Sequence, residues 1–178
     1  MATQKRLLKE LKTVGDVGSL PASIVELQPV DMDDLYRWQC VIHISEESSY
    51  YNGAYFQLDI SIPFNYPLEP PTMKFVTTKD NIANNRYPIS TKIAHCNVDF
   101  KSGDICLDIL KKETWSPAWT IQSAVLAVVV LLDNQEPDSP LNIDMANLVR
   151  SNDKTAIASL IQYYIKSSDC NYLQSKVT

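Results

Sequence analysis

Four extended segments in the first half of the chain, joined by short connections, constrain the fold most strongly. In the third segment apolar residues alternate with polar ones from Phe56 and Gln57 onward, which is the period of a sheet with one face in water. The connections are too short for helical crossovers, so the segments predict an antiparallel meander. The four segments are Ser23 to Leu27, Trp38 to Ile44, Tyr55 to Ile62 and Thr72 to Val76.

Helices are expected before and after these strands. Near the N-terminus, apolar residues recur at helical spacing up to a stop at Gly15, with basic residues on the other face. The stretch Thr120 to Leu132 is apolar nearly all round, which predicts a central buried helix. Two further helices are expected at Asp144 to Arg150 and at Asp153 to Lys166. The first helix carries the apolar Leu7, Leu8, Leu11 and Val14 and the basic Lys5, Arg6, Lys9 and Lys12.

These elements indicate the α+β class. A chain of 178 residues with 45% hydrophobic content can bury one core, and no linker is evident, so we expect a single domain over residues 1–178. The segment Thr77 to Ile93 is the exception to this regular pattern, because it is a long stretch without clear periodicity. Loops of that length are usually either functional or disordered, and both interpretations stay open.

Composition and charge exclude several classes of function. The formal net charge of −5 argues against a nucleic-acid partner, which needs a basic footprint. The longest apolar run, Ala124 to Leu132, is far shorter than the roughly twenty residues of a membrane span, and no signal peptide precedes the first helix. The 4 glycines cannot assemble a nucleotide-binding motif, and the 4 cysteines lack paired spacing. We therefore expect a cytoplasmic protein without direct membrane insertion.

A thiol, a side-chain amide and a rigid aromatic and proline loop follow one another between His95 and Thr120. Cys106 offers a thiolate nucleophile, and Asn97 offers an N–H donor to an oxyanion. Asp108, two residues past the thiol, can polarise or desolvate an incoming amine. These residues indicate a thiol enzyme that handles an activated acyl group.

Other interpretations of the same residues stay open at this point. A Cys-His-Asn hydrolase would use His95 as its general base, although a protease usually brings that base from a distant segment. A zinc site of His95, Cys96 and Cys106 is disfavoured because adjacent residues rarely converge on one metal, so no metal is expected. A disulfide between Cys96 and Cys106 requires Cα atoms within about 7 Å. Cys40 fits a buried, inert thiol and Cys170 an exposed one.

The order of the motifs resembles the ubiquitin-conjugating enzyme family, from Lys5 to about Tyr164. The motifs are Tyr51-Asn52-Gly53, Tyr66-Pro67-Leu68-Glu69-Pro70-Pro71, His95-Cys96-Asn97, Gly103-Asp104-Ile105-Cys106-Leu107-Asp108-Ile109-Leu110 and Trp115-Ser116-Pro117-Ala118-Trp119-Thr120. The resemblance implies the fold of that family. It also implies that Cys106 accepts ubiquitin as a thioester from the ubiquitin-activating enzyme, without a cofactor, and passes it to a lysine or cysteine of a protein substrate.

The resemblance further implies roles for residues around the thiol. Asn97 would donate to the oxyanion, Asp108 would handle the amine, and His95 would be a structural support for the Asn97 loop. The resemblance also implies two docking surfaces. The surface for a RING-type ligase would consist of Pro67, Leu68, Pro117 and Ala118. The surface for the activating enzyme would consist of Lys5, Arg6 and Lys9. Simpler interpretations stand beside these, since a charged helix face is usually only solvated and Trp115 is more often a core residue.

Finer detail points to one branch of the family. Cys96 replaces a proline that would fix the loop before Asn97, and Ser139 stands where many members carry an acidic residue. The stretch from Glu136 to Arg150 resembles the fungal peroxisomal member. That resemblance implies a peroxisomal import receptor as substrate and a peroxisomal membrane anchor protein that holds the chain on the cytosolic face. Conjugation of another ubiquitin-like modifier, or a non-catalytic ubiquitin-binding variant of the fold, are the alternatives.

Overall fold

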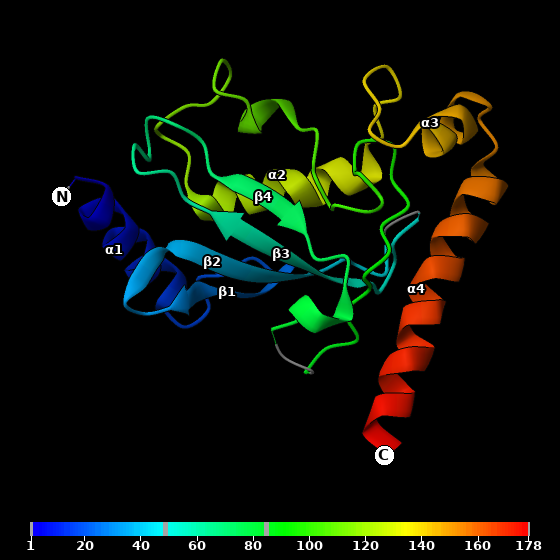
Figure 1. The fold of residues 1–178 in the computed structure, drawn as a ribbon, viewed down its shortest axis with the longest axis horizontal. Coiled ribbons are helices and arrows are strands. Elements are labelled where there is room, and N and C mark those ends of the chain that lie inside the picture. Colours follow the sequence, from blue (N-terminus) through cyan, green and yellow to red (C-terminus); the bar gives the residue numbers. More distant parts are fainter. Residues whose placement is uncertain (1, 48–49, 84–85, 178) are drawn as a thin grey trace.

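The computed structural model shows a four-stranded antiparallel sheet with one helix packed across it and the others at its two ends (Figure 1). It describes residues 2–47, 50–83 and 86–177, with side chains as far as Ser168. The strands pair in the order β1-β2-β3-β4, which confirms the expected meander and the α+β class. The elements are α1 (Ala2–Gly15), β1 (Ile24–Asp31), β2 (Asp34–His43), β3 (Tyr55–Ser61), β4 (Thr72–Phe75), the 3-10 turns η1 (Lys79–Asn81) and η2 (Asp108–Leu110), α2 (Ile121–Asp133), α3 (Ile143–Arg150) and α4 (Lys154–Val177).

The first strand is longer than the sequence suggests. It continues to Asp31, past the expected end at Leu27, although Pro29 lies within it. Proline lacks the N–H that a central strand needs, and it is tolerated here because β1 is an edge strand. The pairing of β1 with β2 also shifts register between Ile24 and Glu26 and again between Pro29 and Asp31, which marks local irregularities in the ladder.

Helix α2 lies on one face of the sheet and supplies much of the core (Figure 1). It begins after a capping box: the Thr120 hydroxyl accepts from the Ser123 N–H, and the Ser123 hydroxyl accepts from the Thr120 N–H. Its buried residues are Ile121, Ala124, Val125, Val128, Leu131 and Leu132. The expectation that α2 is buried on all sides is wrong for the face that points away from the sheet, where Val130 is 63% exposed.

The face of α1 that packs against the core carries both apolar and polar side chains. Leu7 is fully buried, whereas Leu8, which was expected to face inward, is 56% exposed. Thr3 and Glu10 are buried instead. Polar groups are tolerated there because they are hydrogen-bonded: the Thr3 hydroxyl donates to the Tyr66 carbonyl oxygen at 2.7 Å, and the Glu10 carboxylate accepts from several donors.

Helices α3 and α4 are the last elements of the fold. The Asn142 side chain caps α3 by accepting from the Met145 N–H. Helix α4 continues well beyond the expected end at Lys166, and its inward residues include Ile157 and Ile161, as its periodicity predicts. Among the described residues, no helix combines the length and the apolar character that crossing a membrane requires.

The part of the segment Thr77 to Ile93 around η1 lies against the sheet face opposite α2 (Figure 1), whereas Ile89, later in the segment, forms a parallel bridge with Tyr55 of β3. Gln57 of β3 reaches this segment from the sheet: Nε2 donates to the Asn81 carbonyl oxygen at 3.2 Å, and Oε1 accepts from the Ala83 N–H at 3.0 Å. Gln57 is therefore 2% exposed, and the expectation that its face of β3 is wet is wrong at this position. The residues around η1 therefore cover part of this sheet face, and Ile93 at the end of the segment packs in the core.

Candidate functional site

A short hairpin fixes the position of Cys106. Val98 and Ile105 form an antiparallel bridge, and the Cys106 N–H donates to the Asn97 carbonyl oxygen at 2.8 Å. The turn of the hairpin requires Gly103, because its φ is +75° and an added Cβ would lie 1.9 Å from a backbone carbonyl oxygen of β4. The hairpin thus brings together Asn97 and Cys106, two of the residues that the sequence singles out.

The three described cysteines differ in exposure. Cys40 and Cys96 are 0% exposed, whereas Cys106 is partly exposed. All three are free thiols, so no disulfide joins Cys96 to Cys106. Burial raises the pKa of Cys40 well above its usual range and that of Cys96 to about 11. The side chain of Cys170 lies outside the described residues, and no cluster of three or more potential metal ligands occurs among the residues described.

His95 is fully buried, and both of its ring nitrogens have partners. Nδ1 accepts from the Asn97 N–H at 3.0 Å, which leaves Nε2 as the protonated nitrogen that donates to the Leu131 carbonyl oxygen at 2.9 Å. Burial lowers the pKa of His95 to about 4, so the ring is neutral near pH 7. A buried ring engaged at both nitrogens is unsuited to a hydrolase base. The geometry fits the supporting role that the resemblance implies.

The side-chain amide of Asn97 is engaged with the loop that follows α2. Nδ2 donates to the Glu136 carbonyl oxygen at 2.7 Å, and Oδ1 accepts from the Glu136 N–H at 2.8 Å. The Cys96 thiol also donates to Oδ1, at 3.2 Å, and Asn97 is only 2% exposed. In this structure the amide holds the loop rather than pointing at an acyl group on Cys106. The oxyanion role stays a prediction, and the geometry favours a positioning role.

Asp108 opens η2 and is highly exposed. Its side chain is 79% exposed, and Oδ1 lies 2.6 Å from Nζ of Lys111. The hydrogen bond to Asp108 and the carboxylate's charge raise the pKa of Lys111. The carboxylate that is expected to receive an incoming amine therefore already holds an ammonium from its own turn, a contact that sequence reasoning did not include.

The four residues expected to bind a ligase, which we call the ligase patch, lie in two loops that touch. Leu68 is 72% exposed, Pro117 and Ala118 are exposed, and Pro67 is partly exposed. The Trp115 indole Nε1 donates to the Pro67 carbonyl oxygen at 2.8 Å and so ties the two loops together. Trp115 itself is 8% exposed, which confirms that it is a core residue.

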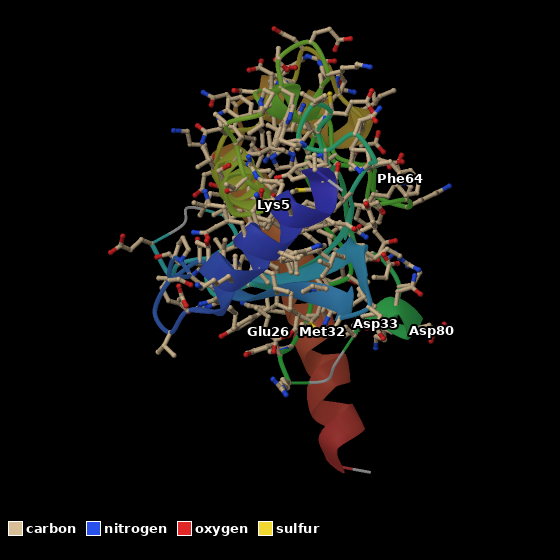
Figure 2. The ribbon with its side chains drawn as sticks, turned by 90° about the vertical axis from the view of Figure 1, so that its left-hand side faces the viewer. Lys5, Glu26, Met32, Asp33, Phe64 and Asp80 are labelled. Atoms are coloured by element: carbon tan, nitrogen blue, oxygen red, sulfur yellow. The ribbon has the colours of Figure 1, made fainter. Side chains whose placement is uncertain are left out.

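Phe64 is a surface residue that sequence reasoning missed. It lies on the same loop as Leu68, is 82% exposed and packs against Tyr36 with ring centroids 5.1 Å apart. Figure 2 shows Phe64 beyond α1 at one side of the molecule. Aromatic side chains are enriched at protein interfaces, so Phe64 is a candidate to extend the ligase patch. One feature of the sequence could have identified Phe64: it follows a proline directly after β3, where the alternation of apolar and polar residues stops.

Helix α1 is joined to the ligase patch through Arg6. Its guanidinium pairs with Glu10 at 2.5 Å and donates to two carbonyl oxygens of the loop before α2, at 3.1 and 2.7 Å. Glu10 accepts in turn from the Ile121 N–H at 2.8 Å. Arg6 is therefore partly buried and structural, which corrects its placement on a solvated outer face. Lys5, which Figure 2 labels on α1, and Lys9 are exposed as expected.

Comparisons with known proteins agree with these observations. Residues 6–164 match the family model described as ubiquitin-conjugating enzyme. The chain is 37% identical to the E2 ubiquitin-conjugating enzyme PEX4 of Komagataella phaffii, over 93% of this chain and 94% of the relative. It is 40% identical to Protein PEROXIN-4 of Arabidopsis thaliana, again over 93% and 94%. The crystal structure of H. polymorpha ubiquitin conjugating enzyme Pex4p in complex with the soluble domain of Pex22p matches with a TM-score of 0.81 and 46% identity, over 93% of this chain and 97% of that chain.

Proposed function

The chain belongs to the ubiquitin-conjugating enzyme family, and from this premise we propose that it accepts ubiquitin as a thioester on Cys106. Enzymes of this family are acyltransferases that act through a cysteine thioester. The observation that carries the assignment is exposure: of the three described cysteines, Cys106 alone is open to solvent. A ubiquitin delivered by another protein can react only with a thiol that the partner can reach.

Loading is an exchange between two thioesters. The Cys106 thiolate attacks the acyl carbon of ubiquitin on the activating enzyme, and the cysteine of that enzyme leaves. One thioester is broken and one is formed, so the step needs no cofactor on this chain, and ATP is consumed by the activating enzyme. The ligase patch and the exposed lysines of α1, Lys5 and Lys9, are the surfaces we assign to the ligase and to the activating enzyme.

Transfer to a substrate amine is the more demanding step. A free lysine has a pKa near 10.4 and is mostly protonated at neutral pH, so the site must receive an ammonium and release a proton. Asp108 is the carboxylate placed for this task, two residues past the thiol and well exposed. Asn97 supports the step by fixing the loop at Glu136 beside the Cys106 hairpin. If that loop opens, the same amide could donate to the oxyanion.

The names of the relatives support a peroxisomal role. We propose that the substrate is a peroxisomal import receptor, modified on a lysine or a cysteine, and that a membrane anchor protein holds the chain on the cytosolic face of the peroxisome. The solved relative forms a complex with the soluble domain of Pex22p. Exposed apolar side chains on the late helices, Ile143 at 66% and Tyr163 at 65%, support a docking surface there.

A loading assay tests the proposed function. The purified chain is incubated with ATP and with ubiquitin or another ubiquitin-like modifier, each with its own activating enzyme, and the products are separated on a non-reducing gel. Ubiquitin is expected to give an adduct that reducing agent removes. An adduct with another modifier but not with ubiquitin would show that the chain conjugates that ubiquitin-like modifier instead. No adduct with any modifier would show that the chain is a non-catalytic ubiquitin-binding variant.

Cell fractionation tests the peroxisomal role separately. A pool of the chain should sediment with peroxisomes, and Tyr163→Ala with Ile143→Ala should reduce that pool without affecting loading. The matched control is Val17→Ala, because Val17 is fully exposed at the opposite end of the chain. Absence of any peroxisomal pool for the unaltered chain would remove this role and leave the conjugating activity intact.

A further inference from the structure

Glu10 is a buried carboxylate that the proposed transfer does not use. It lies on α1 and is 6% exposed, and both of its oxygens accept hydrogen bonds. Oε1 accepts from the Tyr66 hydroxyl at 2.7 Å and from Arg6 Nε at 2.5 Å. Oε2 accepts from the Ile121 N–H at 2.8 Å. Donors from α1, from the loop before β4 and from the start of α2 therefore converge on one side chain.

The segments that Glu10 joins are those that carry the ligase patch. Tyr66 directly precedes Pro67 in one loop of the patch. Ile121 begins α2 shortly after the other loop, which carries Ala118. Glu10 is on neither loop and is buried, so it does not belong to the exposed surface of the patch. Its carboxylate thus holds both loops from inside the fold.

An ionised carboxylate suits this position better than any other side chain of its size. Each partner presents an N–H or an O–H, so each contact needs an acceptor, and a carboxylate offers two acceptor oxygens. Burial and the hydrogen bond to Glu10 raise the pKa of Tyr66, so the hydroxyl keeps its proton and donates it. The negative charge also lies at the first N–H of α2, where the helix dipole favours an anion.

The ion pair between Arg6 and Glu10 contributes geometry more than stability. The two side chains are 24% and 7% exposed, and a buried ion pair often contributes no more to stability than well-packed apolar residues of similar volume. Its members do fix positions, because Arg6 donates to the Pro117 and Trp119 carbonyl oxygens at 3.1 and 2.7 Å. The pair therefore contacts both loops of the ligase patch at the same time.

We infer that Glu10 is the positioning residue of the ligase patch, which sets the spacing of its two loops and so determines how tightly a RING-type ligase binds. The inference rests on the proposed function. Binding depends on shape complementarity at the core of an interface, so a shift of one loop against the other weakens it. The hydrogen bonds described for Glu10 involve α1, the loop before β4 and the start of α2, and none involves the Cys106 hairpin. Loading and ligase-free discharge therefore do not depend on it.

The chain offers a sharp variant and a matched control. Glu10→Gln keeps the size of the side chain but has one acceptor oxygen and an NH2 group, so at least one of the donors meets another donor. Asp16→Asn is the control, because it removes the same charge from an exposed side chain directly after α1. Tyr66→Phe is a second variant, which removes one donor and leaves the Arg6 pair in place. In both variants the Trp115 bond to the Pro67 carbonyl oxygen still joins the loops.

Ligase-stimulated discharge tests the inference. The loaded chain is mixed with free lysine and with increasing concentrations of a purified RING domain that stimulates the unaltered chain. For Glu10→Gln the RING concentration at half-maximal stimulation should rise roughly fivefold or more. The maximal rate, the extent of loading and the rate without the RING domain should stay unchanged. Tyr66→Phe should show a smaller rise, and Asp16→Asn none.

A second measurement needs neither loading nor a ligase. In NMR spectra of the free chain, the amide signals of Leu68 and Ala118 should shift in Glu10→Gln and stay in place in Asp16→Asn. Unchanged signals, or an unchanged half-maximal concentration, would overturn the inference alone. Parallel loss of loading, ligase-free discharge and thermal stability would also overturn it, because Glu10 would then be structural only. If Glu10→Gln does not fold, an unchanged half-maximal concentration in Tyr66→Phe overturns the inference. An unaltered chain that cannot be loaded would overturn the proposed function.

Discussion

Asn97 and the backbone of Glu136 hold each other through two hydrogen bonds, 2.7 Å from Nδ2 to the carbonyl oxygen and 2.8 Å from the N–H to Oδ1. Next to them, the Cys96 N–H donates to Gln135 Oε1 at 3.0 Å, and the Cys96 carbonyl oxygen accepts from the Leu141 N–H at 2.8 Å. The loop after α2 is thus tied at both ends to the segment that carries Asn97. Since the Cys106 N–H donates to the Asn97 carbonyl oxygen, these segments form one structural unit.

The first prediction concerns the contact between Asn97 and Glu136. Asn97→Ala removes both hydrogen bonds to the Glu136 backbone, each worth roughly 0.5–1.5 kcal/mol, so the free energy of unfolding should fall by about 1–3 kcal/mol, and discharge to free lysine should slow. Chemical denaturation and single-turnover discharge measure the two effects. Asn134→Ala, which removes a single exposed side-chain hydrogen bond to the Val130 carbonyl oxygen, is the control. Unchanged stability together with slow discharge would mean that Asn97 acts as an oxyanion donor and not through the loop.

The second prediction concerns Asp108. Asp108→Ala should load normally and discharge more slowly to free lysine near pH 7, because no carboxylate then receives the ammonium. The loss should shrink toward high pH, where the amine is already neutral. Discharge rates measured from about pH 6 to pH 10 provide the test. The same fold-loss at every pH would show that Asp108 only positions the amine.

The third prediction concerns the ligase patch and Phe64. Truncating an apolar anchor in an interface typically costs 1 kcal/mol or more of binding, whereas an exposed side chain contributes little to folding. Leu68→Ala and Phe64→Ala should therefore load and melt like the unaltered chain and lose stimulation by a RING-type ligase. Val17→Ala is the exposed control. Parallel loss of loading and thermal stability would show that these side chains support the fold.

The fourth prediction concerns the pH dependence of stability. Burial lowers the pKa of His95 from 6.5 to about 4, so the unfolded chain binds an extra proton between these values. The contribution of the neutral ring is complete above about pH 6.5 and is lost as the pH falls toward 4, on the order of 2 kcal/mol by pH 5. Denaturation at several pH values measures the slope. A His95→Gln chain that keeps the full slope would contradict this assignment.

Much of the fold could be predicted because its signals are local. The alternation of β3 and the apolar stretch that became α2 each follow from the period of one element. The sequence-based predictions were wrong where a segment distant in sequence covers a residue and changes its burial. Gln57 looks solvent-facing until the segment with Asn81 and Ala83 covers it through two hydrogen bonds. No local period contains those contacts.

The site shows the same division. Cys106, Asn97 and Asp108 could be found from residue types in a short stretch of sequence. Their partners could not, because Glu136 lies far along the chain from Asn97, and the side chain of Lys111 could have pointed in several directions. The sequence therefore identifies which chemical groups are present. The structure shows which hydrogen bonds these groups already make, and for Asn97 those bonds favour a positioning role over the oxyanion role.

The most direct test of the central claim is mass spectrometry of the loaded chain and its cysteine variants. Cys106→Ala should form no thioester with ubiquitin, and Cys106→Ser should form an oxyester that resists mild reducing agent. Cys96→Ala should still load, because the Cys96 thiol is buried. A thioester that persists in Cys106→Ala, or maps to another cysteine of the unaltered chain, would contradict the assignment of Cys106 as the acyl acceptor.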